Sequence, residues 1–369
     1  MEKDYNADKL FSEEGESDET MTNKKQKILI TGGAGFIGHH FVEHFLKNTN
    51  WDIYVVDNLT YASGGLSRIK DIEAYNVDRV KIFTADFTKP LDQQGLIDEI
   101  GQLDYIVHMG AETHVDNSIK DPRKFVYANV VGTLEVLEFA RLYQPNLKRF
   151  IYFSTDEVFG PAPEGVSYKE WDRYNSGNPY SAAKAGGEEL CVAYYNTYKM
   201  PIIITHTMNV FGERQHPEKF IQKVIRKVLA GEEVTIHGNS DKTKSGTRFW
   251  IHARNVVQAM MFIISHKDTE NGDKFNIVGE REVSNLEIAQ MIAKILGKEL
   301  KYKITDFHDE RPGHDFRYAL DGGKMEKMGW KPPVGFDESF KKTIKWMAAD
   351  NHKKWLYDMG EFDTIKEVA

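Results

Sequence analysis

The sequence predicts an α/β protein with a Rossmann-type, doubly wound parallel sheet and a smaller C-terminal α/β lobe. Six short apolar runs of strand length recur along the first part of the chain, at residues 28–31, 53–56, 80–83, 105–108, 150–153 and 202–205. Roughly 20 to 45 residues separate most of them, with helical periodicity in stretches such as 126–143. Near-continuous apolar strands that alternate with helices are typical of a parallel sheet covered on both faces.

This alternation ends after about residue 207. A helical stretch at 218–229, a short strand at 234–237, a polar segment at 238–247 and further helix follow. We therefore predict four parts, namely a disordered acidic tail (1–25), a Rossmann domain (26–206), a mainly substrate-binding lobe interleaved with it (207–350) and a C-terminal tail (351–369). Ligands of open α/β sheets bind beyond the carboxyl ends of the strands, so the lobe is expected to close over that edge.

Composition excludes several classes of partner. The chain has 48 Lys and Arg against 56 Asp and Glu, a net charge of -8, which argues against nucleic acid as a partner. The longest apolar stretch, 256–264, is too short to span a bilayer. Cys191 is the single cysteine, so we expect no internal disulfide, no cysteine-based metal site and a reducing, cytoplasmic location.

A glycine-rich turn follows the first predicted strand and opens a helix. Residues 32–38 read Gly-Gly-Ala-Gly-Phe-Ile-Gly. Glycines let a backbone turn tightly and approach a pyrophosphate, whose charge is met by amide N–H groups and the positive end of the helix. The candidate cofactor contacts here are Gly32, Gly35, Phe36, Ile37 and Gly38.

An acid stands at the end of the second predicted strand. Asp57 lies at a distance from the glycines that suits hydrogen bonds from an adenosine ribose, and its carboxylate would repel a 2′-phosphate, so NAD is favoured over NADP. Asn58 and Thr60 follow it. Asp86 and Phe87, after the third strand, are expected to flank the adenine.

The candidate catalytic residues form two groups. The fifth predicted strand ends in Thr155, Asp156 and Glu157, and Tyr180 and Lys184 follow Pro at the start of a predicted helix. Residues four apart lie on one helical face, and an ammonium beside a phenol favours the phenolate, which is a useful base.

The position of the Tyr180 motif along the chain distinguishes it from other matches to the same pattern. A Tyr-x-x-x-Lys pattern also begins at Tyr5 and Tyr195, but only the Tyr180 pattern follows a strand that ends in a hydroxyl and two carboxylates. Two adjacent carboxylates suit dehydration, because oxidation of a sugar hydroxyl to a ketone acidifies the neighbouring C–H. One carboxylate then removes that proton and the other, protonated, assists departure of hydroxide as water.

These residues resemble the extended short-chain dehydrogenase/reductase family, and within it the dTDP-glucose 4,6-dehydratases. The similarity covers about residues 27–331 and rests on segments 31–38, 57–61, 111–119, 154–160, 180–184, 216–219 and 311–315. It implies that Tyr180, assisted by Thr155 and Lys184, takes the proton of the sugar 4-hydroxyl as hydride passes to NAD. It also implies that Glu157 removes the C5 proton, that Asp156 donates to the 6-hydroxyl and that hydride returns to C6.

The resemblance further implies a site for a nucleoside diphosphate sugar, either dTDP-glucose or UDP-glucose. The residues that it assigns to substrate are His114, Asn209, Glu218, Lys219, Arg248, Arg311 and His314, with Ala111 beside the cofactor. Segment 238–248 is longer than in the family pattern, so thymidine against uridine stays open. A homodimer is usual in the family. Gly186 and Gly187, each costing about 1 kcal/mol in a helix, indicate close packing against the sheet or a second subunit.

Other functions remain open from the sequence. A UDP-sugar 4-epimerase or a UDP-glucuronate decarboxylase also begins with C4 oxidation by a Tyr-Lys pair, although the Asp156–Glu157 pair argues against the epimerase. A non-catalytic NAD-binding regulatory protein is the alternative from another class. The presence of all five candidate catalytic residues argues against it.

Overall fold

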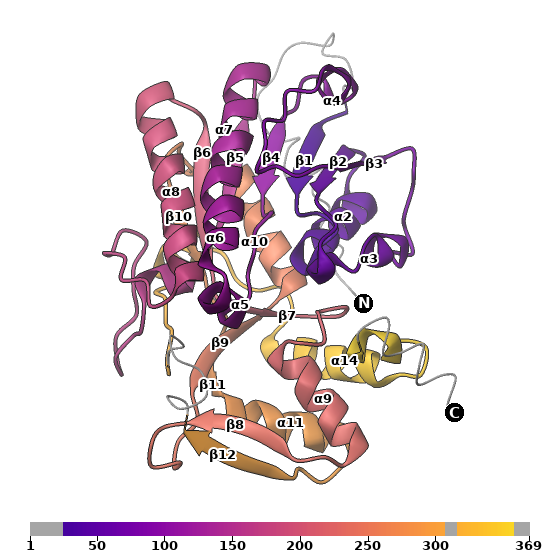
Figure 1. Ribbon diagram of the computed structural model, residues 1–369, viewed down its shortest axis with the longest axis vertical. Helices are drawn as coiled ribbons and strands as arrows, with labels where there is room; N and C mark the ends of the chain where they lie inside the picture. Colours follow the sequence, from indigo (N-terminus) through magenta and orange to yellow (C-terminus); the bar gives the residue numbers. More distant parts are fainter. Residues whose placement is uncertain (1–24, 307–315, 358–369) are drawn as a thin grey trace. The chain divides into compact units, whose positions relative to one another are not determined.

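The structure is a computed structural model that describes residues 25–306 and 316–357. Contacts divide these residues into two units that alternate along the chain (Figure 1). The first unit comprises the residues up to Thr155, Pro179–His206 and Val257–Phe275. The second comprises Asp156–Asn178, Thr207–Val256 and the described residues from Asn276 onward.

A seven-stranded sheet forms the centre of the first unit. Its strands are β1 (Lys27–Thr31), β2 (Asp52–Asp57), β3 (Val80–Thr84), β4 (Tyr105–His108), β5 (Arg149–Thr155), β6 (Ile202–Thr207) and β10 (Lys274–Ile277). Their order is β10-β6-β5-β4-β1-β2-β3, and the neighbours from β3 to β5 run parallel. All six predicted strands are confirmed. The strand order reverses at β1, which lies between β2 and β4, and such a switch point is where open α/β sheets bind ligands.

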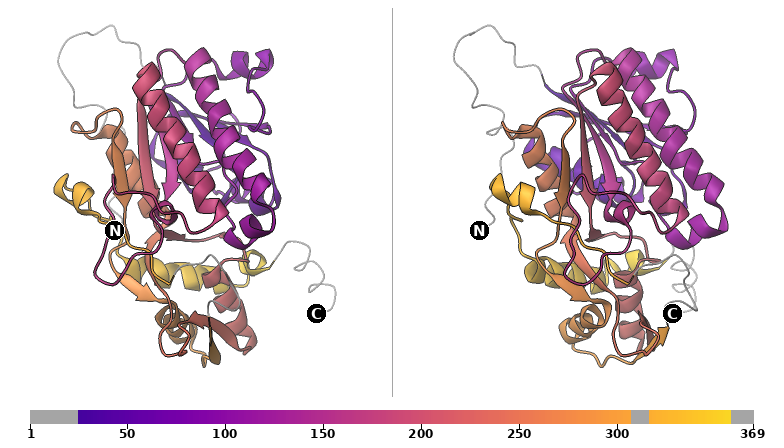
Figure 2. Two further views of the ribbon diagram at one scale, coloured as in Figure 1. Left: turned by 60° about the vertical axis from the view of Figure 1, so that its left-hand side comes forward. Right: turned by 90° about the vertical axis from the view of Figure 1, so that its left-hand side faces the viewer.

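Helices cover both faces of this sheet. They are α2 (Phe36–Asn48), α3 (Ser67–Lys70), α4 (Gln94–Ile100), α5 (Val115–Lys120), α6 (Pro122–Val126), α7 (Gly132–Tyr143), α8 (Pro179–Tyr198) and α10 (Ala253–Ser265). Figure 2 shows α7 and α8 side by side on one face, with α2 and α10 on the other. The helical stretch predicted at 126–143 is confirmed, and it includes a π-helical segment at Tyr127–Val131 between α6 and α7. The doubly wound α/β fold is confirmed.

Close packing explains Gly187 in the middle of α8. A Cβ added there would lie 2.4 Å from the backbone oxygen of Asn129 and 2.5 Å from the hydroxyl of Tyr152. A Cβ on Gly186 would meet only Val130, at 3.1 Å. Gly187 is therefore required by contacts inside the first unit, where α8 crosses the π-helical segment and β5.

The second unit contains two small sheets with four helices. A three-stranded sheet joins β7 (Asn209–Phe211), β9 (Thr247–His252) and β11 (Glu282–Ser284), and a parallel pair joins β8 (Val234–Gly238) and β12 (Tyr302–Asp306). The helices are α9 (Phe220–Ala230), α11 (Asn285–Leu296), α13 (Gly323–Lys327) and α14 (Phe336–Ala348), with 3-10 turns at η3 (Asp156–Phe159) and η4 (Lys353–Leu356). Helix α9 buries Ile221, Val224, Ile225 and Val228 at helical spacing in the core of this unit.

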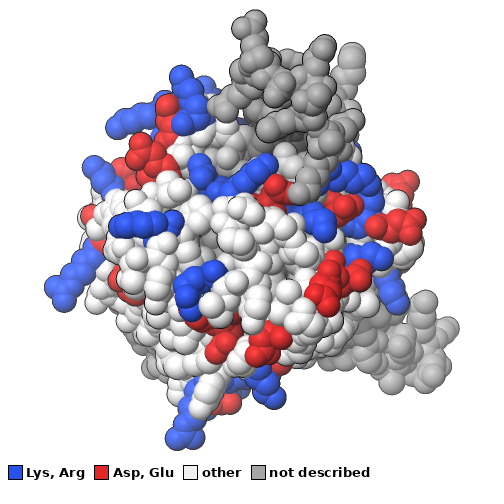
Figure 3. All heavy atoms as spheres, turned by 90° about the horizontal axis from the view of Figure 1, so that it is seen from above, with Lys and Arg blue, Asp and Glu red and all other residues white. Residues whose placement is uncertain are grey.

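The surface carries charges of both signs. On the face that Figure 3 shows, acidic and basic side chains of the described residues are interspersed, so neither sign is gathered into one area. In the described part of the chain, no helix combines the length and the hydropathy that crossing a bilayer requires.

Candidate active site

The glycine turn between β1 and α2 forms a cradle without side chains. Gly32 has φ +71°, and a Cβ added to it would lie 2.8 Å from Cα of Gly110 at the end of β4. A Cβ on Gly38 would lie 2.2 Å from the backbone oxygen of Gly32. Gly35 caps α2 and supplies no side-chain hydrogen bond, so Phe36 and Ile37 begin a 13-residue helix with their amides available to an anion.

A chain of hydrogen bonds holds the ends of β1 and β4 together beside this cradle. Thr31 Oγ1 accepts from the backbone N–H of Gly110 at 3.0 Å, so its own proton points to His108 Nδ1, 2.7 Å away. His108 Nε2 then donates to Thr133 at 3.1 Å. Burial lowers the pKa of His108 to about 3, so this histidine is neutral and structural.

Asp57 connects the end of β2 to the glycine turn. It is 6% exposed, and its carboxylate accepts from the backbone N–H of Ala34 at 3.0 Å and of Leu59 at 2.8 Å. Burial raises its pKa, while these two hydrogen bonds and the charge of Arg68 act in the opposite direction. The Arg68 guanidinium is itself buried and donates to the backbone carbonyl oxygens of residues 62 and 63. Its hydrogen bonds therefore stabilise the turn that follows β2.

The other predicted cofactor residues lie in three nearby turns. Asn58 is exposed and Thr60 half-buried in the turn after Asp57. Asp86 accepts from the amide and the hydroxyl of Thr88, at 3.0 and 2.7 Å. The buried Phe87 ring packs where a Cβ on Gly110 would meet it at 2.5 Å, and Ala111 follows directly on the chain.

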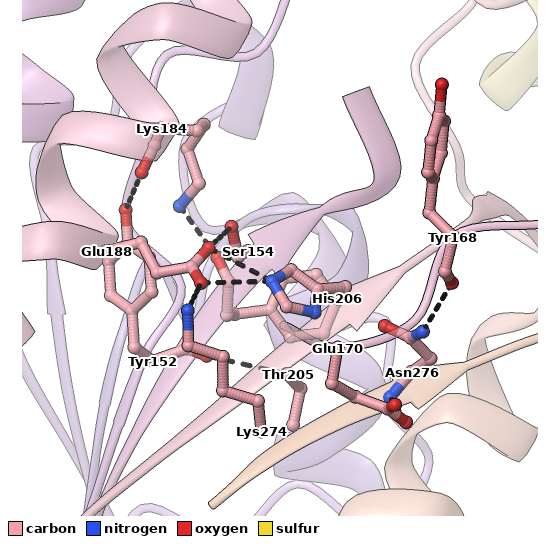
Figure 4. A network of polar contacts seen from close by, with 11 residues as sticks. Tyr152, Ser154, Tyr168, Glu170, Lys184, Glu188, Thr205, His206, Lys274 and Asn276 are labelled. Carbon is pink, nitrogen blue, oxygen red and sulfur yellow. Dashed lines mark hydrogen bonds and ion pairs between the residues drawn. The ribbon is translucent and has the colours of Figure 1, made fainter. Parts of the chain in front are cut away.

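Tyr180 and Lys184 lie in the first turns of α8, which begins at Pro179, and both are buried. Lys184 Nζ donates to the backbone oxygen of Phe153 at 2.6 Å and stands 4.2 Å from the centre of the Tyr152 ring (Figure 4). Burial lowers the pKa of Lys184 to about 8, while the negative charge of Glu188 acts to raise it. Thr155 is the last residue of β5 and is 8% exposed.

Asp156 and Glu157 open the 3-10 turn directly after Thr155 and belong to the second unit. Asp156 is buried. Glu157 Oε2 accepts from Asn178 Nδ2 at 3.2 Å and from the hydroxyl of Tyr318 at 3.5 Å. Both donors favour the charged carboxylate, which suits a base. The sequence did not single out either donor for this role.

Three of the predicted substrate residues of the second unit lie at element ends. Asn209 begins β7, Glu218 and Lys219 precede α9, and their charged groups are 3.6 Å apart. Arg248 on β9 donates to the backbone oxygens of its own neighbour Thr247 at 2.7 Å and of Phe316 at 2.9 Å.

Tyr318 contacts both Arg248 and Glu157. The guanidinium carbon of Arg248 lies 4.8 Å from the centre of the Tyr318 ring, whose hydroxyl donates to Glu157. His114, in the first unit, caps α5 and accepts from the backbone N–H of Asn117 at 3.4 Å. Arg311 and His314 lie outside the described residues.

Metal ligands do not gather in the described ranges, where no group of three or more His, Cys, Asp or Glu side chains is placed to hold an ion. Cys191 is a buried free thiol on α8.

Comparison with known proteins gives consistent results. The family model described as GDP-mannose 4,6 dehydratase matches residues 29–343. A dTDP-glucose 4,6-dehydratase of Salmonella typhimurium is 36% identical over 89% of this chain and 94% of its own length. One of Streptomyces niveus is 35% identical, with 89% of this chain and 94% of its own length covered.

Solved structures agree with these relatives. The dTDP-glucose 4,6-dehydratase of Streptomyces venezuelae, crystallised with NAD bound, superposes with a TM-score of 0.77 at 31% identity, covering 88% of this chain and 98% of that one. A UDP-glucuronic acid 4-epimerase of Bacillus cereus in complex with NAD also has a TM-score of 0.77, at 26% identity, with 90% of this chain and 100% of that one covered.

Proposed function

The chain belongs to the extended short-chain dehydrogenases/reductases of the GDP-mannose 4,6 dehydratase family, and from that membership we propose that it is an NAD-dependent dTDP-glucose 4,6-dehydratase. It converts the sugar nucleotide to its 4-keto-6-deoxy form with loss of one water. The observation that carries this proposal is the Thr155-Asp156-Glu157 run at the end of β5, with the Glu157 carboxylate hydrogen-bonded by two donors.

The residues of the first unit fit NAD. Gly32 and Gly38 leave no room for a Cβ, so only backbone lines the turn where a pyrophosphate approaches. The N-terminus of α2 offers amides and the positive end of the helix to that group. The Asp57 carboxylate suits an unphosphorylated ribose and opposes a 2′-phosphate.

The chain's own residues supply the proton transfers. When bound, NAD provides the hydride acceptor at C4 and the hydride donor at C6. Tyr180 takes the proton of the 4-hydroxyl, with Thr155 and the Lys184 ammonium assisting it. Glu157 removes the C5 proton, which the new C4 ketone has acidified, and returns a proton to C5 when C6 is reduced. Asp156 donates a proton to the 6-hydroxyl, which leaves as water.

Substitutions of Glu157 and Asp156 test their assigned proton transfers separately. We expect Glu157→Gln to bind NAD normally but to lose at least about a hundredfold in C5 deuterium exchange from D₂O, followed by NMR. Asp156→Asn should retain C5 exchange and lose water elimination. Glu164→Gln, an exposed acid of the same unit, is the matched control and should match wild type. Unchanged exchange and turnover in Glu157→Gln would falsify the assignment of the base.

The structure also resembles 4-epimerases, but a 4-epimerase reaction gives the paired acids Asp156 and Glu157 no role. Epimerisation at C4 requires oxidation and return of hydride at one carbon, with no proton removed from C5. Asp156 and Glu157 would then have no reaction step to serve. The same D₂O experiment separates the two activities, because an epimerase leaves C5 unlabelled.

Two finer expectations stay predictions. We infer a homodimer from the usual assembly of the family, and sedimentation that shows only monomer at micromolar concentration would contradict it. We also infer a cytoplasmic location, which fractionation of cells that produce the protein would check.

A further inference from the structure

A cluster of polar and charged side chains lies buried in the first unit, between α8 and the sheet. It consists of Glu188 from α8, His206 from β6, Lys274 from β10 and Ser154 from β5 (Figure 4). The side chains of Glu188 and His206 are fully buried and that of Lys274 is 3% exposed. The proton transfers described above use none of these four residues.

The Glu188 carboxylate is the centre of this cluster. Lys274 Nζ donates to Oε1 and Ser154 Oγ donates to Oε2, both at 2.8 Å. His206 Nε2 lies 3.0 and 3.1 Å from the two oxygens. Burial alone would raise the pKa of Glu188, but His206 and Lys274 outweigh burial and hold it well below its usual range. Glu188 is therefore a fixed negative charge.

Stability alone does not account for this arrangement. Desolvation of two charges cancels much of their attraction, so apolar residues of similar volume are often equally stabilising in place of a buried ion pair. Side chains from three strands, β5, β6 and β10, nevertheless converge on one carboxylate of α8. Such a cluster specifies geometry more than it adds free energy of folding, and the geometry that it specifies is that of β5 against α8.

The cluster reaches the candidate catalytic residues along both elements. Ser154 immediately precedes Thr155, and Glu188 lies one helical turn after Lys184. Helix α8 thus holds two consecutive residues of β5, since Lys184 binds the backbone oxygen of Phe153 and Glu188 binds the hydroxyl of Ser154. Tyr152, one residue further back, donates to the backbone oxygen of Lys184 at 3.1 Å.

We propose that Glu188 is a positioning residue, whose carboxylate fixes the end of β5 against α8 so that Thr155 keeps its register with Tyr180, and whose negative charge lies one helical turn from the Lys184 ammonium. This inference rests on the proposed function, because it assigns Glu188 a role in the same reaction. It adds a residue that touches neither substrate nor cofactor and acts through Lys184 and Ser154.

The electrostatic part of the proposal depends on the groups around Lys184. His108 on β4 is neutral because burial lowers its pKa, and Tyr152 on β5 and Cys191 on α8 are neutral because burial raises theirs. His206 and Lys274 act from β6 and β10 through Glu188. Helices α5 and α6 also pack on α8. Their charged residues, Asp116, Lys120, Arg123 and Lys124, do not contribute to the shift in the pKa of Lys184.

The direction of the effect follows from these charges. Glu188 acts to raise the pKa of Lys184, so its neutralisation lowers that pKa further. Loss of this one charge is expected to shift the pKa of Lys184 by on the order of one unit. The alkaline limb of the kcat profile, where the Lys184 ammonium is lost, then moves to lower pH.

The test measures kcat, KM and the kcat–pH profile for dehydration of dTDP-glucose in three variants of the whole enzyme. Glu188→Gln should lower kcat about tenfold with KM within about twofold, and should move the alkaline limb down by on the order of one unit. Ser154→Ala keeps the ion pair and should lower kcat without moving the limb. Glu189→Gln, the exposed neighbour on α8, should match wild type.

Each outcome decides the question. A folded Glu188→Gln enzyme with wild-type kcat and profile overturns the proposal. If that variant fails to fold because Lys274 is left unpaired, Ser154→Ala decides, and an unchanged kcat in it overturns the positioning role. If the wild-type protein has no dehydratase activity, the proposed function is rejected instead. The kcat values of the variants could then not be compared with that of the wild type.

Discussion

The contacts around α8 predict that the same substitution will affect stability differently at two adjacent glycines, Gly186 and Gly187. In Gly187→Ala the new methyl group would lie 2.4 Å from the backbone oxygen of Asn129 and 2.5 Å from the Tyr152 hydroxyl. The oxygen belongs to the π-helical segment, and the hydroxyl is held by its bond to the backbone oxygen of Lys184 at 3.1 Å. Neither atom can move without breaking another contact.

The magnitude is the difference of two effects. Overpacking of this kind costs about 1–3 kcal/mol, while Ala gains about 1 kcal/mol over Gly in a helix interior. We expect Gly187→Ala to lower the free energy of unfolding by up to about 2 kcal/mol. Gly186→Ala meets only a Val130 methyl at 3.1 Å and should leave stability unchanged or raise it by up to about 1 kcal/mol.

Urea unfolding, followed by circular dichroism, measures both changes. A shift of the midpoint at constant slope reports a change in stability rather than in the unfolded state. Gly186→Ala is the matched control, since it makes the same substitution one residue away. The packing argument is refuted if Gly187→Ala is as stable as Gly186→Ala.

Three further predictions concern the site. Because burial lowers the pKa of Lys184 to about 8, its ammonium is present below that pH and lost above it, so kcat should fall as pH rises through about 8; a kcat that stays flat to pH ~10 would contradict this. Asp57→Ala should weaken NAD binding by about ten- to a hundredfold, because a charged acceptor is lost, and calorimetric titration with an unchanged Kd would reject the ribose contact. Tyr318→Phe should slow C5 deuterium exchange about tenfold by removing a donor to Glu157, whereas Tyr168→Phe, whose hydroxyl bonds elsewhere, should not; equal rates in the two variants would exclude the Tyr318 contact from the reaction.

The strands show what the sequence can and cannot reveal. The six predicted strands contain apolar runs, and most of them are recognisable because both of their faces are buried. The edge strand β3 is only partly buried and is recognisable from its apolar residues Val80, Ile82 and Phe83. The seventh, β10, contains Lys274 and Asn276 and reads as a polar segment. It is nevertheless buried, because Lys274 pairs with Glu188 and the Asn276 amide donates to the backbone oxygen of Tyr168 at 3.0 Å. Those partners are remote in sequence, so no local pattern could predict them.

The candidate site likewise contains residues that the sequence could predict and contacts that it could not. The glycine turn, the Thr155-Asp156-Glu157 run and the Tyr180 motif are local in sequence, and motif spacing was enough to select them. The donors to Glu157 are not local, since Tyr318 is 161 residues away. His114 illustrates the opposite limit, because a polar residue after a strand suggests a ligand contact, while the structure also gives it a capping bond within α5.

The most direct test of the account is to incubate the purified protein with dTDP-glucose, and separately with UDP-glucose, without added cofactor, and to follow each sugar nucleotide by mass spectrometry. We predict loss of one water from dTDP-glucose, with NAD carried through purification. Loss of water from UDP-glucose alone would show a dehydratase whose substrate is the uridine nucleotide and not the thymidine nucleotide. No loss from either nucleotide, even with NAD added, would contradict the proposed activity.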